Sequence, residues 1–305
     1  MSVDAPPTAA PSPPAEKKSR RGIIIGLSIL LAFFATYGLS LVGVRALQRS
    51  EGPLPPLDLS QAGPDDTVVQ MRLQELKPTT NRLTVNVIIY PGESLYDKRF
   101  DELNTDIAVR LYPPNDLGDL VFPKGKAPAQ VTTTIEAHGD PGSWPFDSYR
   151  TEPQSADVFV GTGANRKRVP AVVQVTGSMD GWDAETRRSI DTSETGSHNN
   201  TSVVVTLQRA KGPLIFDLGI ILVLISLPTL ALLVAIPMAM GRRKFVPPFA
   251  TWYAANLFAI VPLRNILPGA PPPGSMIDQA LVQWVLLALA TAMALYIYSW
   301  VKQGD

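Results

Sequence analysis

Residues 214–240 read LIFDLGIILVLISLPTLALLVAIPMAM, and Asp217 is the only charged residue in this run. A helix of about 20 apolar residues is long enough to cross the ~30 Å hydrocarbon layer of a membrane. Pro228 and Pro237 lie inside the run, but neighbouring helices in a membrane bundle can satisfy the backbone groups that a proline leaves free. The sequence therefore predicts a transmembrane helix over residues 213–240.

Three other apolar stretches predict further spans. Residues 23–44 contain no charged residue and exceed the roughly 7–15 apolar residues of a cleaved signal peptide, so a retained anchor is favoured there. Residues 245–263 form a weaker apolar stretch that contains Asn256. Residues 277–301 form a strong one ending in aromatic residues, which are typical of membrane boundaries. Together with residues 213–240, these stretches predict four transmembrane helices.

Lysine and arginine near the span ends predict the orientation, because loops rich in these residues stay on the cytoplasmic side. Such residues precede the first span, connect the second to the third and follow the fourth: Lys17, Lys18, Arg20, Arg21, Arg242, Arg243, Lys244 and Lys302. The short loop between the third and fourth spans has only Arg264. We therefore expect a multi-pass protein of the plasma (inner) membrane, with both termini cytoplasmic and residues 45–212 extracytoplasmic. If residues 245–263 were only re-entrant, the last span would run the other way.

The rest of the chain divides into tails, a spacer and a domain. Residues 1–22 are rich in proline and in small and charged residues, which predicts a disordered cytoplasmic tail. Residues 302–305 form a short cytoplasmic tail at the other end. Proline and glycine recur in residues 45–66, which predicts an extended spacer. Residues 67–212 follow the spacer and are long enough to form a domain.

Alternation of apolar residues predicts a β-domain over residues 67–212. In residues 82–90, RLTVNVIIY, the side chains of Leu83, Val85 and Val87 share one face, as in a half-buried strand. Further strands rich in Val, Ile and Thr are expected over residues 67–76, 106–112, 129–138, 157–160, 169–178 and 202–209. Short strands without a long helical pattern favour an antiparallel sandwich or barrel. The expected fold class is therefore membrane α plus all-β: four transmembrane helices with an inserted extracytoplasmic antiparallel β-sandwich.

Composition argues against several classes of function. The chain has 27 basic and 27 acidic residues, so it offers no net basic field for nucleic acid. It has no cysteine, which excludes disulfides, thiolate zinc sites, iron–sulfur clusters and cysteine nucleophiles, and its two histidines leave little for metal chemistry. The Gly-x-Ser-x-Gly, P-loop, dinucleotide-binding and His-Glu-x-x-His motifs are missing from the sequence. We therefore predict no catalytic residue, no cofactor, no metal site and no nucleic-acid partner.

Polar residues at the outer ends of the spans form the first candidate site. They are Asp217 in the second span, Arg264 and Asn265 after the third, and Asp278 at the start of the fourth. An arginine between two carboxylates could pair with both, and ionisable residues within membranes cost free energy unless they are paired. The pattern favours a salt-bridge cluster that fixes helix packing, with binding of a substrate or an ion as the alternative. Residues 264–276 form a Pro-rich outer loop, interpreted as a stiff connection or as a docking surface.

The second candidate site is the aromatic turn Trp144-Pro145-Phe146-Asp147. Aromatic residues closely spaced around a turn more often fill a small core than bind a ligand. Asp147 could cap the turn or pair with a cation such as Arg150. We therefore interpret this turn as a structural corner of the β-domain.

These features resemble an uncharacterised family of multi-pass membrane proteins, the domain-of-unknown-function family 4436, which is frequent in mycobacteria and related actinobacteria. The resemblance covers most of the chain. It rests on the early span, the strand over residues 83–90 followed by Pro91-Gly92, the Trp144-Pro145-Phe146-Asp147 turn, and residues 263–274 followed by Asp278. It implies a membrane topology and a cell-envelope setting, without an assigned activity.

A more distant likeness is to the pentameric ligand-gated channels. In that family an aromatic-Pro-x-Asp loop meets the membrane domain, and residues 144–147 look like this loop. The final strand of this chain also passes through Arg209 into an apolar helix, as in the channels. The chain departs from that plan, because a span precedes the sandwich, three spans follow it, and residues 245–262 lack the polar lining pattern of a pore helix.

Three functions are consistent with these features. The first is a non-enzymatic cell-envelope protein whose extracytoplasmic β-domain binds a partner protein, a lipid or another envelope component, while the helices anchor it in the lipid bilayer. The second is a transporter or channel accessory subunit with a distant ligand-gated-channel-like sandwich, using Asp217, Arg264 and Asp278. The third is a hydrolase hidden in the β-domain. The missing catalytic motifs favour the first function, and the oligomeric state is left open.

Overall fold

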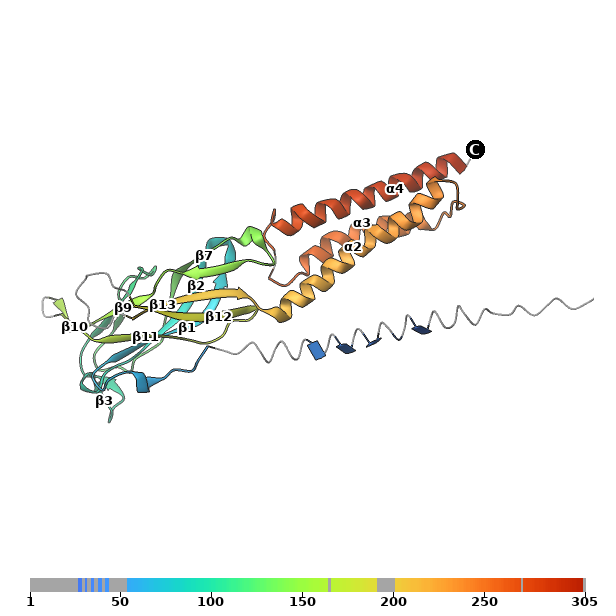
Figure 1. Ribbon diagram of the computed structural model, residues 1–305. Coiled ribbons are helices and arrows are strands. Elements are labelled where there is room, and N and C mark those ends of the chain that lie inside the picture. The colour runs from blue at the N-terminus through green and yellow to red at the C-terminus, as the bar shows by residue number, and fades with distance from the viewer. Residues whose placement is uncertain are drawn as a thin grey trace, which may run out of the picture. The chain divides into compact units, whose positions relative to one another are not determined.

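The computed structural model describes residues 27–28, 31, 34–35, 38–39, 42–43, 54–163, 166–190, 201–269 and 271–303. Met1–Ala46 and Leu47–Asp305 form two separate compact units. In the first unit the described positions are helical, while the expected tail over residues 1–22 and the remainder of the expected span over residues 23–44 lie outside the described residues. The second unit holds a β-domain followed by helices α2, α3 and α4 (Figure 1).

Short strands joined by turns build the β-domain. The strands are β1 (Thr67–Lys77), β2 (Arg82–Tyr90), β3 (Tyr96–Asp97), β4 (Glu102–Leu103), β5 (Ile107–Tyr112), β6 (Leu120–Phe122), β7 (Val131–Gly139), β8 (Ser148–Thr151), β9 (Ser155–Val160), β10 (Lys167–Val169), β11 (Ala171–Thr176), β12 (Trp182–Ile190) and β13 (Thr201–Arg209). Single 3-10 turns are η1 (Leu59–Gln61), η2 (Pro78–Thr80), η3 (Glu93–Leu95) and η4 (Pro141–Ser143). The helices are α2 (Lys211–Ala239), α3 (Phe249–Asn265) and α4 (Gln283–Gln303), and the π-helical turn η6 (Asp278–Val282) leads directly into α4.

Two main sheets share one hydrophobic core. The larger sheet has the strand order β11-β1-β2-β7-β8-β13-β12, the smaller has the order β10-β9-β5-β6, and β3 and β4 form a separate pair. Within the two main sheets neighbouring strands are antiparallel except β1 and β11, which run parallel. Inward-facing residues of both sheets, such as Val85 and Val109, are fully buried in the same core. The predicted β-sandwich is thereby confirmed, with one parallel pair that the sequence did not indicate.

Each predicted strand is present within a few residues of its expected bounds, and β3, β4, β6, β8, β10 and β12 are additional. β12 reads WDAETRRSI and lies at the edge of the larger sheet. Among its described side chains, those of Trp182 and Ala184 at its beginning pack against the core. Edge strands are often rich in charged residues, which hide the two-residue apolar period by which strands are recognised.

The expectation of four transmembrane helices is wrong. Among the described residues, two helices are long and apolar enough to cross a membrane: α2, and Asp278–Gln303, which joins η6 and α4. α3 is shorter, with 17 residues, or about 25 Å at 1.5 Å per residue. The predicted span over residues 245–263 is a weaker apolar stretch, and its helix starts only at Phe249, after Pro247 and Pro248.

The three helices lie alongside one another, and their course decides which loops meet the β-domain (Figure 1). Leu267 and Ile277, from the segment between α3 and α4, pack against Trp144 of the β-domain. Far from this contact, Nε2 of Gln303 at the end of α4 donates to the carbonyl oxygens of Met238 (3.0 Å) and Arg243 (3.2 Å). α2 and α4 therefore both run away from the β-domain, and α3 returns toward it.

Candidate functional site at the junction of the β-domain and the helices

An ion pair between Asp147 and Arg209 lies at the end of the β-domain that meets the helices. The register of β8 and β13 pairs Ser148 with Gln208, so the next position along the ladder places Asp147 opposite Arg209. Nε of Arg209 donates to Oδ1 of Asp147 at 2.8 Å, and Nη2 donates to Oδ2 at 3.0 Å. The Asp147 side chain is 0% exposed and that of Arg209 is 9% exposed. The pair is therefore bidentate and withdrawn from water.

Two aromatic residues surround this ion pair. β12 and β13 pair Trp182 with Arg209, and the guanidinium lies 4.4 Å from the centroid of the Trp182 ring. Tyr149 contacts Trp182 edge-on, with ring centroids 5.4 Å apart. Burial, together with the nearby Asp147 carboxylate, raises the pKa of Tyr149 well above its ordinary value, so the phenol stays neutral. Arg209 is thus held by an ion pair on one neighbouring strand and a cation–π contact on the other.

Trp144, at the start of the aromatic turn, joins the β-domain to the helices through apolar contact. Its side chain is fully buried in a cluster with Leu267 and Ile277, and Ile220 of α2 packs against the same cluster. Phe146, by contrast, is 63% exposed. Trp144 therefore fills a small core that the β-domain and the helices build together.

Gly269 brings the Pro-rich loop directly against Arg209. Its φ of +77° lies in the left-handed region, which glycine adopts without steric cost. A Cβ atom at this position would collide with Nη1 of Arg209. Both the conformation and the space at position 269 therefore require glycine.

Asp217 of α2 lies close to this site without a partner of its own. The residue is 1% exposed, its Oδ1 has no hydrogen-bond partner in the described part of the chain, and no ion pair reaches it there. Arg209 is bonded to Asp147 instead. Asp217 is therefore a buried carboxyl group without an ion-pair partner among the described residues, which costs free energy.

The remaining predicted polar residues form a separate unit. Nε of Arg264 donates to Oδ1 of Asp278 at 2.9 Å, and Nη2 donates to Oδ2 at 2.7 Å and to the carbonyl oxygen of Pro271 at 2.8 Å. Asn265 is exposed, and its Oδ1 lies 3.5 Å from Nη1 of Arg264. The structure thus brings Arg264, Asn265 and Asp278 together, while the described contacts of Arg264 do not include Asp217. Because Arg264 is bonded within its own loop, the geometry favours its structural role.

The partner of Asp147 differs from the one that the sequence suggested. Arg150 lies three positions after Asp147, and side chains an odd number of residues apart on a strand point to opposite faces. Asp147 faces inward with Tyr149, and Arg150 is exposed on the other face. Before the structure was known, only the likeness to the ligand-gated channels pointed to Arg209, because it relates the aromatic turn to the final strand. Nothing in the sequence pointed to Trp182 or Gly269 as contacts of that arginine.

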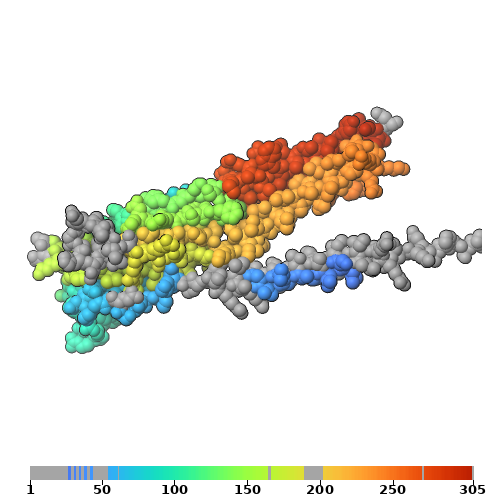
Figure 2. Space-filling model, viewed as in Figure 1, coloured from blue at the N-terminus to red at the C-terminus, as the bar shows by residue number. Residues whose placement is uncertain are grey.

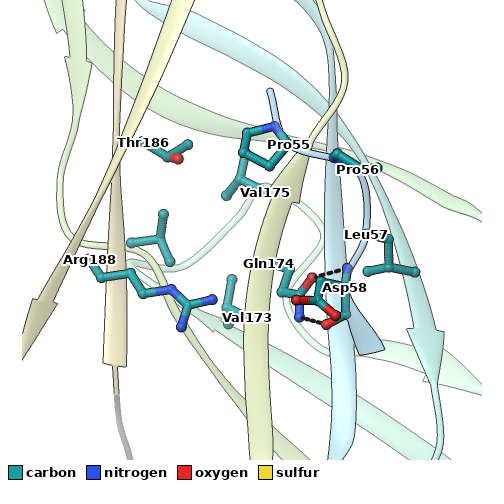
Figure 3. Close-up of a pocket in the computed structure, with 10 residues that line it drawn as sticks. Pro55, Pro56, Leu57, Asp58, Val173, Gln174, Val175, Thr186 and Arg188 are labelled. Carbon is teal, nitrogen blue, oxygen red and sulfur yellow. Dashed lines mark hydrogen bonds between the residues drawn. The ribbon is translucent and has the colours of Figure 1, made fainter. Parts of the chain in front are cut away.

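A pocket of about 630 Å³ opens where strands from the two edges of the larger sheet approach each other (Figure 3). On one side lie β11 and the segment over residues 55–58. Gln174 of β11 holds this segment, because its side chain accepts from the backbone N–H of Asp58 at 3.0 Å and donates to the Asp58 carbonyl at 2.6 Å. This pocket was not predicted from the sequence, since it depends on the curvature of the sheet.

The other side of the pocket is formed by β12. Its inward-facing positions begin with Trp182 and Ala184, which pack against the core, and continue with Thr186 and Arg188, which line the pocket. The same strand face therefore changes from apolar to polar where the core opens.

Replacing Arg209 by Met removes the cation and leaves the Asp147 carboxylate buried. Breaking a buried ion pair in this way costs about 3–5 kcal/mol. We therefore expect Arg209→Met to lower the Tm of the detergent-solubilised protein markedly. Thermal unfolding monitored by tryptophan fluorescence measures this change. The control is Arg187→Met, which removes an arginine from an exposed pair with Glu185 on β12 and should change the Tm little. Similar losses for the two variants would contradict the importance of burial.

A second prediction concerns Gly269 and its matched control Gly274. Both have positive φ, but a Cβ at Gly274 meets nothing within 4 Å, whereas one at Gly269 collides with Arg209. Gly274→Ala should therefore show only the conformational cost of roughly 1 kcal/mol. Gly269→Ala should lower the Tm further, because the loop must move off the guanidinium. Equal Tm values for the two variants would show that the loop does not press on Arg209.

The third prediction uses the two aspartates that sequence analysis grouped together. Asp217→Leu removes an unpartnered buried carboxyl group and should increase the free energy of unfolding by about 1–3 kcal/mol. The Tm should therefore rise. Asp278→Leu leaves Arg264 without its ion-pair partner and should lower it. If both substitutions shifted the Tm in the same direction, the assignment of Asp217 as unpaired and of Asp278 as an ion-pair partner would be refuted.

Comparison with known families agrees with the boundary at Arg209. Residues 57–207 match the family model of a domain of unknown function, DUF4436, and residues 209–303 match that of a second domain of unknown function, DUF8686. A search of curated proteins found no match to the chain. The first matched region is the β-domain and the second contains the helices, so the two meet at the residue that joins them. Residues 57–207 therefore belong to the DUF4436 family, as the resemblance indicated, and this match does not extend over the helices.

Proposed function

We propose that this protein is a non-enzymatic membrane protein of the cell envelope, whose extracytoplasmic β-domain binds a partner protein or an envelope component. In this proposal α2 and α4 cross the plasma membrane and α3 packs beside them. The junction at Arg209 seats the β-domain on the helices.

The exposed apolar surface of the helices is the observation that carries this proposal. Mean hydropathy reaches 2.7 in an 18-residue stretch of α2 and 2.0 in one of Asp278–Gln303. Only 28% of the first stretch and 22% of the second is buried. Exposed side chains on α2 and α4, the orange and red helices of Figure 2, include Leu222, Leu233, Trp284, Leu287 and Ile297. An apolar helix in the core of a soluble protein would be mostly buried. Apolar surface of this extent supports the proposed contact with lipid.

The distribution of charge supports the orientation. Arg242, Arg243, Lys244 and Lys302 lie at the ends of α2 and α4 that are remote from the β-domain. Loops rich in lysine and arginine stay on the cytoplasmic side. The β-domain is therefore assigned to the extracytoplasmic side in this proposal.

The pocket between β11 and β12 supports binding by the β-domain. It is concave, it combines apolar side chains with Thr186 and Arg188, and edge strands flank it. Binding sites of proteins commonly combine an apolar surface with a few polar groups in this way. We therefore assign partner binding to this pocket.

Cysteine accessibility tests the orientation, because the natural chain has no cysteine and gives no background. Lys124→Cys places a thiol on an exposed turn of the β-domain, and Arg243→Cys places one at the remote end of α2. A membrane-impermeant maleimide should label Lys124→Cys in intact cells and Arg243→Cys only after permeabilisation. The reverse pattern would overturn the proposed location of the β-domain.

Crosslinking tests the pocket. We expect Thr186→Trp, which fills the pocket, to reduce the set of proteins and lipids crosslinked to the chain in membranes, identified by mass spectrometry. Thr162→Trp, the same change at an exposed turn, should leave that set unchanged. A chain without residues 67–209 provides the reference for contacts made by the helices alone. If all four chains gave the same set, binding by the β-domain would be excluded.

A further inference from the structure

A second pocket, of about 680 Å³, lies at the end of the helices remote from the β-domain. One wall is apolar and comes from the end of α2 and the start of α3. The other wall is the basic turn between these helices. The residues that define the two walls are Leu233, Val234, Phe249, Arg242, Arg243 and Lys244.

Backbone contacts fix the position of the basic turn. Gly241, with a φ of +71°, ends α2, and the N–H groups of Arg242 and Arg243 donate to the carbonyl oxygen of Pro237 at 2.9 and 3.2 Å. Gln303 holds the turn from α4, because its Nε2 reaches the Arg243 carbonyl at 3.2 Å and its Oε1 accepts from the N–H of Phe245 at 2.7 Å. The three cationic side chains therefore project from a backbone that is already in place.

Among the residues that the structure describes, no acidic side chain pairs with this turn. The sequence has no acidic residue between Asp217 and Asp278, and none from residue 279 to residue 304. Within residues 201–269 and 271–303, no ion pair involves Arg242, Arg243 or Lys244, and all three are exposed. An anion is the complement of such a site, and arginine binds phosphate oxygens well.

We propose that this pocket binds an anionic phospholipid, with the phosphate on the basic turn and an acyl chain along Leu233, Val234 and Phe249. The inference rests on the proposed membrane location of α2. A soluble phosphate would use only the basic wall, and an uncharged lipid only the apolar one. A phospholipid with net negative charge uses both, and basic sites beside helices at the cytoplasmic surface attract such lipids.

Native mass spectrometry of the full-length protein in mild detergent tests this site. Phosphatidylglycerol should be retained on the protein in preference to phosphatidylcholine. The variant Arg242→Gln/Arg243→Gln/Lys244→Gln should bind phosphatidylglycerol at least about tenfold more weakly. The control Lys77→Gln/Lys124→Gln/Lys126→Gln removes the same charge from exposed positions of the β-domain and should bind as the natural chain does. Val246→Ser tests the apolar wall and should also weaken retention.

Several outcomes would overturn the lipid site. They are equal retention of the two lipids, equal binding by the basic-turn variant and the control, or displacement by glycerol 3-phosphate at concentrations similar to those of the lipid. The last outcome would show a site for soluble phosphate. Extraction of membranes with alkaline carbonate distinguishes failure of the lipid site from failure of the proposed membrane location. If the natural chain resists extraction but shows no lipid preference, only the lipid site fails; if it is extracted, both proposals fail.

Discussion

The ion pair between Asp147 and Arg209 is the constraint on which the junction depends. The two side chains close the end of the sandwich core nearest the helices, and they do so away from water. A charge in that position is stable only with a partner and with its remaining surfaces covered. Trp182 covers one face of the guanidinium, and the loop at Gly269 lies against it. The strand order β8-β13-β12, the aromatic turn and the Pro-rich loop are thereby tied to one arginine.

This arrangement links the β-domain mechanically to the helices. β13 ends at Arg209 and α2 begins at Lys211, so the chain has almost no slack between the sheet and the first helix. Trp144 adds an apolar contact with Leu267 and Ile277, from the segment that precedes α4. Displacement of the turn at residues 144–147 would therefore act on both α2 and α4. Asp217, on the first turns of α2, is buried, and its Oδ1 has no hydrogen-bond partner among the described residues.

The helices combine two surfaces of different chemistry. Along most of their length the outer side chains of α2 and α4 are apolar and exposed, whereas the turn after α2 is strongly basic. Tyr253 and Tyr296 stay inside, where each phenol donates to a backbone carbonyl, of Ala231 in one case and of Val246 in the other. These two phenols are thus paired within the bundle, while apolar side chains of α2 and α4 face outward. Outward-facing apolar side chains are the reverse of a soluble helical bundle and agree with the proposed lipid environment.

Much of the β-domain could be predicted because its signal is local. Residues such as Leu83, Val85 and Val87 alternate in the sequence, and the strand they form is present with the predicted bounds. β12 escaped prediction because it is an edge strand with few apolar residues. The span over residues 245–263 was wrong for a related reason: hydropathy records composition, whereas Pro247 and Pro248 decide where the helix begins.

The candidate site shows the limit of such reasoning more clearly. The aromatic turn and the polar residues near the spans were identified individually, but their pairing was not, since Asp147 and Arg209 are 62 residues apart. The sequence by itself determined most of the β-strand pattern and the apolar character of α2 and α4, because these depend on periodicity and composition along the chain. Only the tertiary structure decided that Arg209 lies between Asp147 and Trp182 and against Gly269. Strand order and register, which bring distant residues together, are set by packing of the whole domain.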